Sequence, residues 1–238
     1  MLGYRVNRLG LGKDGLASAR LNRILSHRGI RGLIIGPPHF HAHAHIRLDW
    51  SQFAAVTIGS SLWKPRINRV QHHHYMGMIL ALRNLRRLGR KRVALILPEI
   101  LNARTQGSYV ACFLANQSGK SQDLAQRIHL YSTWEDDRFQ QLMKRIKPDA
   151  VLCGQIDDVP RIQSILGNSN ETGIACLNVF PGTPDIAGID QHYKLIGGRA
   201  VDLIIGELQH GAFSLPASPI STMVEGTWQD GASLVRKN

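Results

Sequence analysis

The segment spanning residues 70–97 constrains the fold more than any other stretch of the chain. Within it Gly77, Ala81 and Leu85 recur at helical spacing, and Gly89 stands where a helix typically ends. The apolar run V-A-L-I-L follows after three basic residues, in the pattern of a buried strand. This spacing alone is typical of any α/β protein, so the segment predicts a helix followed by a core strand.

Predicted strands and helices alternate along the whole chain. Short apolar runs bounded by turn residues predict strands at 4–9, 32–35, 54–58, 93–97, 128–131, 150–153, 174–179 and 221–225. Amphipathic stretches predict helices at 16–27, 75–88, 106–116, 135–146, 159–166 and 192–209. Such alternation indicates parallel sheets with helices on both faces, a fold that binds ligands at the carboxyl ends of its strands.

The composition is that of an ordinary globular protein, with 43% hydrophobic and 19% charged residues. No apolar run approaches the ~18 residues that a membrane-spanning helix needs. The first residues contain no continuous apolar stretch typical of a signal peptide, so we expect a cytoplasmic protein without a membrane association. Cys112, Cys153 and Cys176 are widely spaced and form no C-x-x-C pair, which predicts free, buried thiols.

The formal net charge of +12 favours acidic partners or proximity to nucleic acid. The basic residues are scattered apart from one cluster between Arg83 and Arg92. That cluster spans the predicted end of a helix, where the helix dipole favours cations. We therefore interpret it as a solvated helix face rather than a DNA contact.

Four further stretches match, in order, the motifs of one protein family. They are 27–35 (H-R-G-I-R-G-L-I-I), 53–58 (F-A-A-V-T-I), 104–111 (R-T-Q-G-S-Y-V-A) and 189–201 (I-D-Q-H-Y-K-L-I-G-G-R-A-V). Together with segment 70–97 they resemble the effector-binding domain of LacI/GalR-type transcriptional regulators, the lactose-repressor family. The match covers nearly the whole chain.

The resemblance implies an α/β protein with the two-lobed, type I periplasmic-binding-protein-like fold, in which helices flank parallel sheets. We expect residues 1–89 and 190–218 to form the N-terminal lobe, and residues 90–189 and 219–238 the C-terminal lobe. A small-molecule effector such as a carbohydrate would bind between the lobes and stabilise one inter-lobe angle. The resemblance also implies a homodimer.

Members of the family begin with a helix-turn-helix headpiece followed by a first strand–helix unit. Residues 3–6 (G-Y-R-V) resemble the second strand of the effector domain, and alternatively residues 2–7 are the tail of a headpiece. We therefore expect the first strand–helix unit to be missing from the sheet. Specific recognition of operator DNA is then expected only through a headpiece that this chain does not contain.

The resemblance also suggests effector-binding residues. Arg104 matches the arginine with which the family holds its effector, and its planar fork of donors can hold sugar hydroxyls or a carboxylate. The alternative for Arg104 is a solvated position on a helix. Gln191 and Tyr193 match positions near the hinge, where an amide can pair with a hydroxyl and a ring can cover a sugar face.

Three further candidates lie where the sequence departs from the family motifs. His73 stands where the family commonly has Asp, and Gln155 follows Gly154 where the family has an Asn-Asp pair. Trp134 is a candidate second stacking surface, or alternatively a core tryptophan. The usual G-(F/Y)-D-D motif is replaced by N-V-F-P-G at residues 178–182, which puts a sugar ligand in question.

Histidines alternate at His39, His41, His43 and His45, and imidazoles on one face of a strand suit zinc, copper or nickel. The segment follows two prolines and is typical of a loop between strands, which is the interpretation we favour. A metal site formed by His39, His41 and His43 is the alternative.

Three classes of function compete. A regulator's effector domain fits the ordered motifs and the basic charge. A stand-alone solute-binding or sugar-binding protein shares the fold but normally carries a signal sequence. An enzyme is disfavoured, because the chain has no G-x-S-x-G, P-loop or strand-following G-x-G-x-x-G, and we expect no cofactor.

Overall fold

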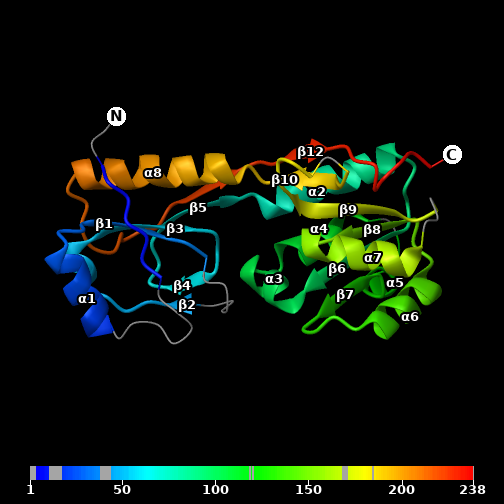
Figure 1. Ribbon diagram of the computed structural model, residues 1–238, viewed down its shortest axis with the longest axis horizontal. Helices are drawn as coiled ribbons and strands as arrows, with labels where there is room; N and C mark the ends of the chain where they lie inside the picture. Colours follow the sequence, from blue (N-terminus) through cyan, green and yellow to red (C-terminus); the bar gives the residue numbers. More distant parts are fainter. Residues whose placement is uncertain are drawn as a thin grey trace.

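The computed structural model describes residues 4–10, 18–37, 44–117, 119, 121–167, 171–183 and 185–237. The described chain forms two units side by side along the long axis of the molecule, each built around a parallel sheet (Figure 1). We call them the four-stranded unit (residues 4–72 and 193–224) and the six-stranded unit (residues 74–190 and 227–237). The predicted α/β class with helix-flanked parallel sheets is confirmed.

The four-stranded unit has one helix along one face of its sheet. Its strands lie in the order β1 (Gly32–Ile35), β3 (Ala54–Ile58), β5 (Asn68–His72) and β11 (Ser221–Val224), all parallel. Helix α8 (Tyr193–Gln209) covers one face. The other face carries α1 (Ser18–His27), the short strands β2 (Ala44–His45) and β4 (Leu62–Lys64), and a 3-10 turn at Trp50–Gln52.

The six-stranded unit has helices on both faces of its sheet. Its strands lie in the order β12 (Thr227–Gln229), β10 (Ala187–Asp190), β9 (Gly173–Val179), β8 (Ala150–Cys153), β6 (Val93–Pro98) and β7 (Ile128–Tyr131). Among these described strands, only β12 is antiparallel to its neighbour. Helices α2 (His74–Arg87) and α4 (Ser108–Asn116) cover one face, and α6 (Asp136–Ile146) and α7 (Val159–Leu166) the other. The remaining elements are α3 (Glu99–Arg104), α5 (Ser121–Ala125) and a 3-10 turn at Ile156–Asp158.

The chain passes between the two units three times. The crossings lie between β5 and α2 at His73, between β10 and α8 at Gln191–His192, and between β11 and β12 at Glu225–Gly226. A hydrogen bond from His73 N to Val224 O joins the first crossing to the third over 2.8 Å. The crossings therefore lie next to one another and form a narrow connection between the units.

The sequence assigned two elements to the wrong unit. Helix α2 was expected in the N-terminal lobe, which we bounded at residue 89, but its apolar face packs against strands of the six-stranded sheet. Strand β11 was expected in the C-terminal lobe, from residue 219, but it pairs with β5 in the four-stranded sheet. The chain leaves the four-stranded unit at His73, just before α2 begins, and again at Glu225, just after β11 ends. The expected lobe boundaries lay at the end of a helix and ahead of β11 instead.

Local details also differ from the prediction. Residues 4–10 contain no regular secondary structure where a strand was predicted, and β1 pairs only with β3 among the described strands. The helix predicted from residue 106 begins at Ser108, because Gln106 (φ 54°) and Gly107 (φ 69°) adopt left-handed conformations that separate it from α3. Strands β2, β4, β5, β10 and β12 and helices α3 and α5 were not predicted.

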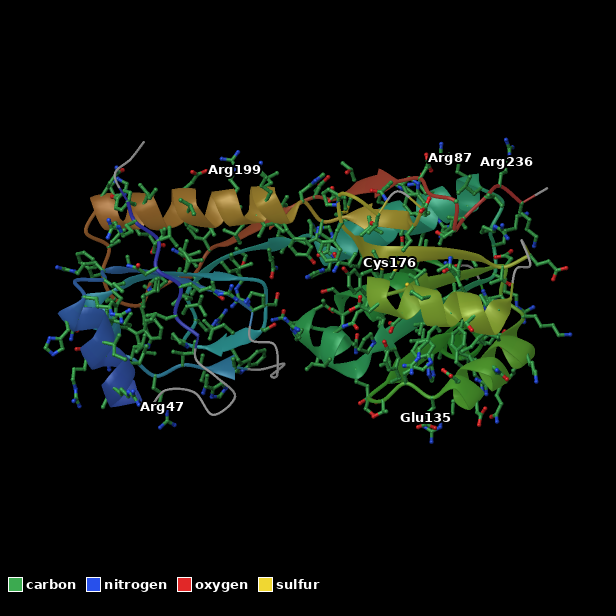
Figure 2. All side chains as sticks on the ribbon, in the orientation of Figure 1. Arg47, Arg87, Glu135, Cys176, Arg199 and Arg236 are labelled. Carbon is green, nitrogen blue, oxygen red and sulfur yellow. The ribbon has the colours of Figure 1, made fainter. Side chains whose placement is uncertain are left out.

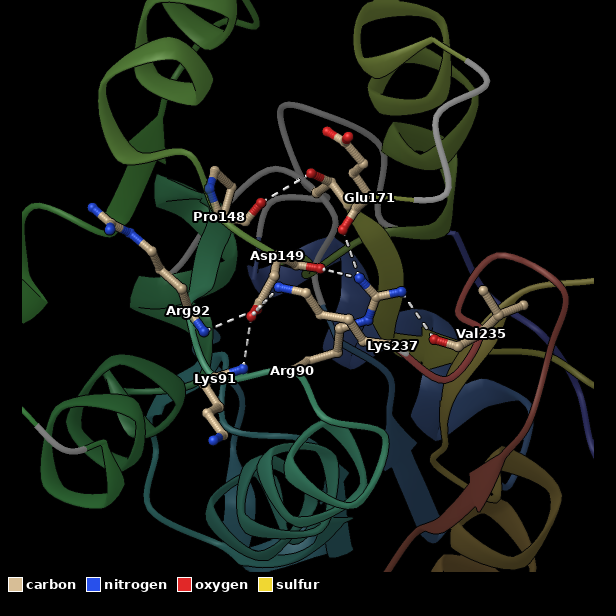
Figure 3. A network of polar contacts seen from close by, with 9 residues as sticks. Arg90, Lys91, Arg92, Pro148, Asp149, Glu171, Val235 and Lys237 are labelled. Atoms are coloured by element: carbon tan, nitrogen blue, oxygen red, sulfur yellow. Dashed lines mark hydrogen bonds and ion pairs between the residues drawn. The ribbon is translucent and has the colours of Figure 1, made fainter.

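Arg90 is part of the core and not of a solvated helix face, which corrects the sequence interpretation. Its side chain is only 1% exposed. The guanidinium donates hydrogen bonds to the carbonyl oxygens of Asp149 (2.9 Å), Glu171 (2.6 Å) and Val235 (2.9 Å), as Figure 3 shows. The Asp149 carboxylate in turn accepts from the backbone N–H groups of Lys91 and Arg92. This network attaches the C-terminal segment to the amino ends of β6, β8 and β9.

Replacing Arg90 by Leu should lower the free energy of unfolding by about 3 kcal/mol, because three buried carbonyl groups lose a charged donor. Urea denaturation followed by circular dichroism measures the loss. The exposed Arg83 is the control, and Arg83→Leu should change the stability by less than about 0.5 kcal/mol. Equal effects of the two substitutions would contradict the structural role of Arg90.

Candidate functional site

The carboxyl ends of strands from both sheets lie at the junction between the units. Strand β5 ends at the first crossing, so the parallel strands β1 and β3 end at the same edge of their sheet. Strand β10 ends at the second crossing, so β6, β8 and β9 end at the facing edge of the other sheet (Figure 1). In open parallel sheets this edge is where ligands bind, which makes the junction the candidate site.

Arg104 connects the two units directly. Its Nε donates a hydrogen bond of 3.1 Å to Oγ of Ser61, which lies in the loop after β3. The side chain is half-buried, and this burial lowers the pKa of the guanidinium. No carboxylate of the described residues forms a salt bridge with Arg104. It is thus a partly desolvated cation whose remaining N–H donors are available to a ligand.

The position of Arg104 follows from close packing beneath α3. A Cβ atom at Gly154 would lie 2.6 Å from the side chains of both Leu97 and Leu101, so only glycine lets α3 approach the end of β8. The left-handed residues Gln106 and Gly107 then end the helix directly after Arg104 and Thr105. The arginine therefore stands on a short helix that packs through Leu101 against the core at the end of a strand.

A polar chain runs through the second crossing. Gln191 Nε2 donates to Tyr109 Oη (3.1 Å) and to the Leu177 carbonyl (2.8 Å). Tyr109 Oη lies 2.9 Å from Nδ1 of His74 and can donate its proton there, because burial lowers the pKa of His74 to about 3 and keeps the imidazole neutral. Gln191 is 6% exposed and all its protein partners are internal, so its first role is to hold the crossing together.

Tyr193 presents an accessible ring at the junction. Its hydroxyl donates to Asn178 Oδ1 over 2.9 Å and lies 3.2 Å from Gln191 Oε1. Its ring stacks on Phe180 with centroids 5.6 Å apart, and the two residues are 45% and 41% exposed. The stacked pair is an apolar surface of the kind that covers the face of a sugar or another flat ligand.

Phe180 was missed by the sequence analysis. It lies in the N-V-F-P-G stretch, which was noted only as a departure from the family motif. Its partner Tyr193 is thirteen residues away along the chain and comes from another element, so no local spacing connects the two. An exposed aromatic residue just after a core strand was the available signal.

The first crossing is built from histidines with structural contacts. His73 is the N-cap of α2, with its Nδ1 accepting from Met76 N at 3.4 Å. His72 is 3% exposed, lies 3.2 Å from the Val224 carbonyl through Nδ1, and has no hydrogen-bond partner at Nε2. A Cβ atom at Gly77 would lie 2.5 Å from that Nε2 atom, so the imidazole fills space that only a glycine leaves open.

The other two candidates lie apart from this group. Gln155 follows the end of β8 at the correct edge of the sheet and is half-buried, and its role in a site stays a prediction. Trp134 hydrogen-bonds Asp136 through Nε1 (2.6 Å) and packs against Tyr131 and Phe139 beside α6. These contacts fit the core alternative for Trp134.

The histidine-rich stretch, the cysteines and the helices bear on further predictions made from the sequence. His39, His41 and His43 lie outside the described residues, and the described part of the chain contains no group of three His, Cys, Asp or Glu side chains placed to hold a metal ion. The three cysteines are buried free thiols, as predicted. None of the described helices is long and apolar enough to cross a membrane.

Two cavities, of about 760 and 580 Å³, lie away from the junction. They are lined by residues near the amino ends of β8 and β9, among them Thr172 and Val235. Ligands of parallel sheets bind at the opposite edge, and the larger cavity contains the Asp149 side chain already engaged with Lys237 (3.4 Å). We therefore retain the junction as the candidate site.

Comparison with known proteins identifies the fold. No protein-family model matches the chain, and no curated protein sequence is similar to it. Among solved structures, the lactose repressor bound to an anti-inducer superposes with a TM-score of 0.65 at 17% identity, over 97% of this chain and 86% of that one. A LacI transcriptional regulator from Lactobacillus brevis gives 0.65 at 14% identity, over 88% and 82%. A LacI-family CcpA from Weissella paramesenteroides with bound glucose gives 0.61 at 13% identity, over 92% and 82%. The chain has the two-lobed fold of LacI-type effector-binding domains, as the sequence motifs predicted.

Acid should weaken the folded state through His72. Burial lowers the pKa of His72 to about 4 in the folded chain, whereas an unfolded histidine titrates near 6.5. The unfolded state therefore takes up the proton first, and the stability that is present above pH 6.5 falls as the pH decreases toward 4. By pH 5 the loss should be about 2 kcal/mol.

Urea denaturation between pH 5 and 7.5 measures this dependence. His72→Gln should reduce it, whereas the exposed His45→Gln should leave it unchanged. Burial also lowers the pKa of His74, so this second imidazole should contribute in the same direction and keep some of the slope in the His72 variant. A slope unaffected by His72→Gln would contradict the buried, neutral state of His72.

Proposed function

We propose that this chain is the effector-sensing domain of a LacI-type DNA-binding transcriptional regulator, and that a small molecule binds between its two units. The observation that carries the proposal is the contact of Arg104 with Ser61 beside the stacked Phe180–Tyr193 pair. A cation from one unit, a hydroxyl from the other and an aromatic surface from the crossing lie at the edge where parallel sheets bind ligands.

We propose a carbohydrate as the ligand class. Structures with this fold include LacI-family regulators with bound cellobiose, ribose and glucose. In the proposed complex Arg104 donates hydrogen bonds to ligand hydroxyls, Tyr193 covers an apolar sugar face, and Gln191 keeps the crossing in place behind it. His73, Gln155 and Trp134 stay predictions, since the side-chain contacts of His73 and Trp134 are with residues close to them in the sequence.

The proposed mechanism is a change of the angle between the units. A ligand that contacts both units favours the arrangement in which those contacts are made together, and the three crossings are the hinge about which the angle changes. We propose that a homodimer in the cytoplasm passes this angle to a headpiece, which reads the operator. The chemistry is binding without catalysis, and no cofactor takes part.

Replacing Arg104 by Ala should weaken effector binding about tenfold or more, which corresponds to the loss of a charge-assisted hydrogen bond of about 1.5–3 kcal/mol. The ligand is first identified by thermal shift with glucose, ribose and cellobiose, and its affinity is then measured by calorimetry. Arg145→Ala, at an exposed position of the same unit, is the matched control and should bind like the parent.

Two results would contradict the proposal. If Arg104→Ala binds the sugar with the affinity of the parent, then Arg104 is a surface residue and the site lies elsewhere. If none of the sugars stabilises the parent chain at millimolar concentration, then the carbohydrate class is wrong. Circular dichroism of each variant separates lost binding from lost folding.

A further inference from the structure

Charge is distributed very unevenly along this chain. Seventeen of the 29 basic residues but only two of the 17 acidic residues, Asp14 and Asp49, lie within residues 1–98. Residues 99–238 therefore hold 12 basic and 15 acidic residues and are slightly acidic. Eleven of these seventeen basic residues lie within residues 1–72, which precede the six-stranded unit, and the other six lie between Arg83 and Arg92 inside that unit.

Helix α1 presents an uncompensated basic stripe. Arg20, Arg23 and His27 follow one another at helical spacing on the exposed side, and Arg28 continues the stripe in the turn after the helix. The helix contains no acidic residue. We call Arg20, Arg23 and Arg28 the arginine stripe. Within the described part of the chain none of the three forms a salt bridge, whereas Arg87, Arg138, Arg161 and Arg199 in other elements each do.

Two more arginines lie beside this stripe. Leu9 and Leu48 pack in the same apolar cluster as Leu21 and Leu25 of α1, which brings their neighbours Arg8 and Arg47 next to the helix. Both arginines are exposed, and Figure 2 shows Arg47 extending away from the protein below α1. The nearby Asp49 carboxylate accepts hydrogen bonds from Ser51 and Gln52 over 2.6 Å and forms no salt bridge with an arginine among the described residues. Its single negative charge is outnumbered by the arginines around it.

The helix that carries the stripe lies far from the proposed effector site. Helix α1 lies at the end of the four-stranded unit that is farther from the six-stranded unit (Figure 1). A partner bound there would not obstruct the junction. The surface can therefore act independently of Arg104, and its test does not depend on the proposed effector.

The geometry favours a nucleic-acid backbone over a membrane or an acidic protein. Helices that bind membranes insert apolar side chains, but Leu21 and Leu25 of α1 are only 6% and 2% exposed, buried beside Phe53. The stripe consists of arginines, whose planar fork of donors matches the oxygens of a phosphate. Along a helix with a rise of about 1.5 Å per residue, the stripe spans roughly 10 Å, which several phosphates of a duplex can follow.

We propose that the arginine stripe of α1, with Arg8 and Arg47 beside it, contacts the phosphate backbone of double-stranded DNA without reading its sequence. Such contacts increase affinity and position a protein on the duplex, while base recognition stays with another element. The four-stranded unit would then be held against DNA by its own surface. The contact should be strongly dependent on salt, because each neutralised phosphate releases counterions.

The experiment measures fluorescence anisotropy of a labelled duplex of about 25 base pairs and random sequence, titrated with the full chain between 50 and 200 mM NaCl. The test variant combines Arg20→Gln, Arg23→Gln and Arg28→Gln. The matched control combines Arg83→Gln, Arg145→Gln and Arg236→Gln, which removes the same charge from exposed positions of the six-stranded unit. A third variant combines Arg20→Lys, Arg23→Lys and Arg28→Lys. It keeps the positive charge and shows whether helix α1 tolerates substitution at these positions.

We expect the test variant to bind at least tenfold more weakly at 50 mM NaCl and to lose about two to three units of the slope of log affinity against log salt. The control and the lysine variant should keep most of the affinity and slope of the parent. Equal losses in test and control variants would show diffuse attraction by net charge and overturn the proposal. Absence of DNA binding by the parent would also overturn it. So would stronger binding to phosphatidylserine vesicles or polyglutamate than to DNA under the same salt.

Discussion

Three passages of chain connect the two sheets at one edge of each, and hydrogen bonds hold these passages to one another and to the six-stranded unit. The contact between His73 N and Val224 O joins the first and third crossings, and the Gln191 amide attaches the second crossing to Tyr109 of the six-stranded unit. Because these contacts fix where the sheets meet, they also fix which strand ends face one another. Arg104 and Ser61 meet only as a consequence of that arrangement.

Much of the connection is stabilised by hydrogen bonds among neutral groups, with the Asp190 carboxylate accepting from His192 N over 2.8 Å beside them. His72 and His74 are kept uncharged by burial, and the phenol of Tyr109 has a pKa raised by the same cause. Hydrogen bonds among neutral groups tolerate small changes of angle better than a buried charge, which loses much more when its partner moves. Arg104, a partly buried cation, stands at the edge of this region, where we propose that a ligand reaches it.

The sequence predicted the elements with strong periodicity and missed those whose pattern is set by distant partners. Helix α2 and strand β6 were recognisable because their apolar residues repeat locally. Strand β5 reads N-R-V-Q-H, and it is a strand because α8 covers Val70 while β3 and β11 pair on either side. Arg90 looked solvated within a basic run, since its carbonyl partners at 149, 171 and 235 lie far away along the chain. Of the site, Arg104, Gln191 and Tyr193 came from the motifs, whereas Phe180 depended on a stacking contact across the junction.

Both units are completed by segments from late in the chain. The four-stranded sheet obtains its outer strand from residues 221–224, and the six-stranded unit is closed when Lys237 N bonds the Leu88 carbonyl and Arg90 holds Val235. Domains usually fold in order as they leave the ribosome. Here neither unit can reach its final state until residues 221–224 and 235–237 have been synthesised, so the two units must mature together.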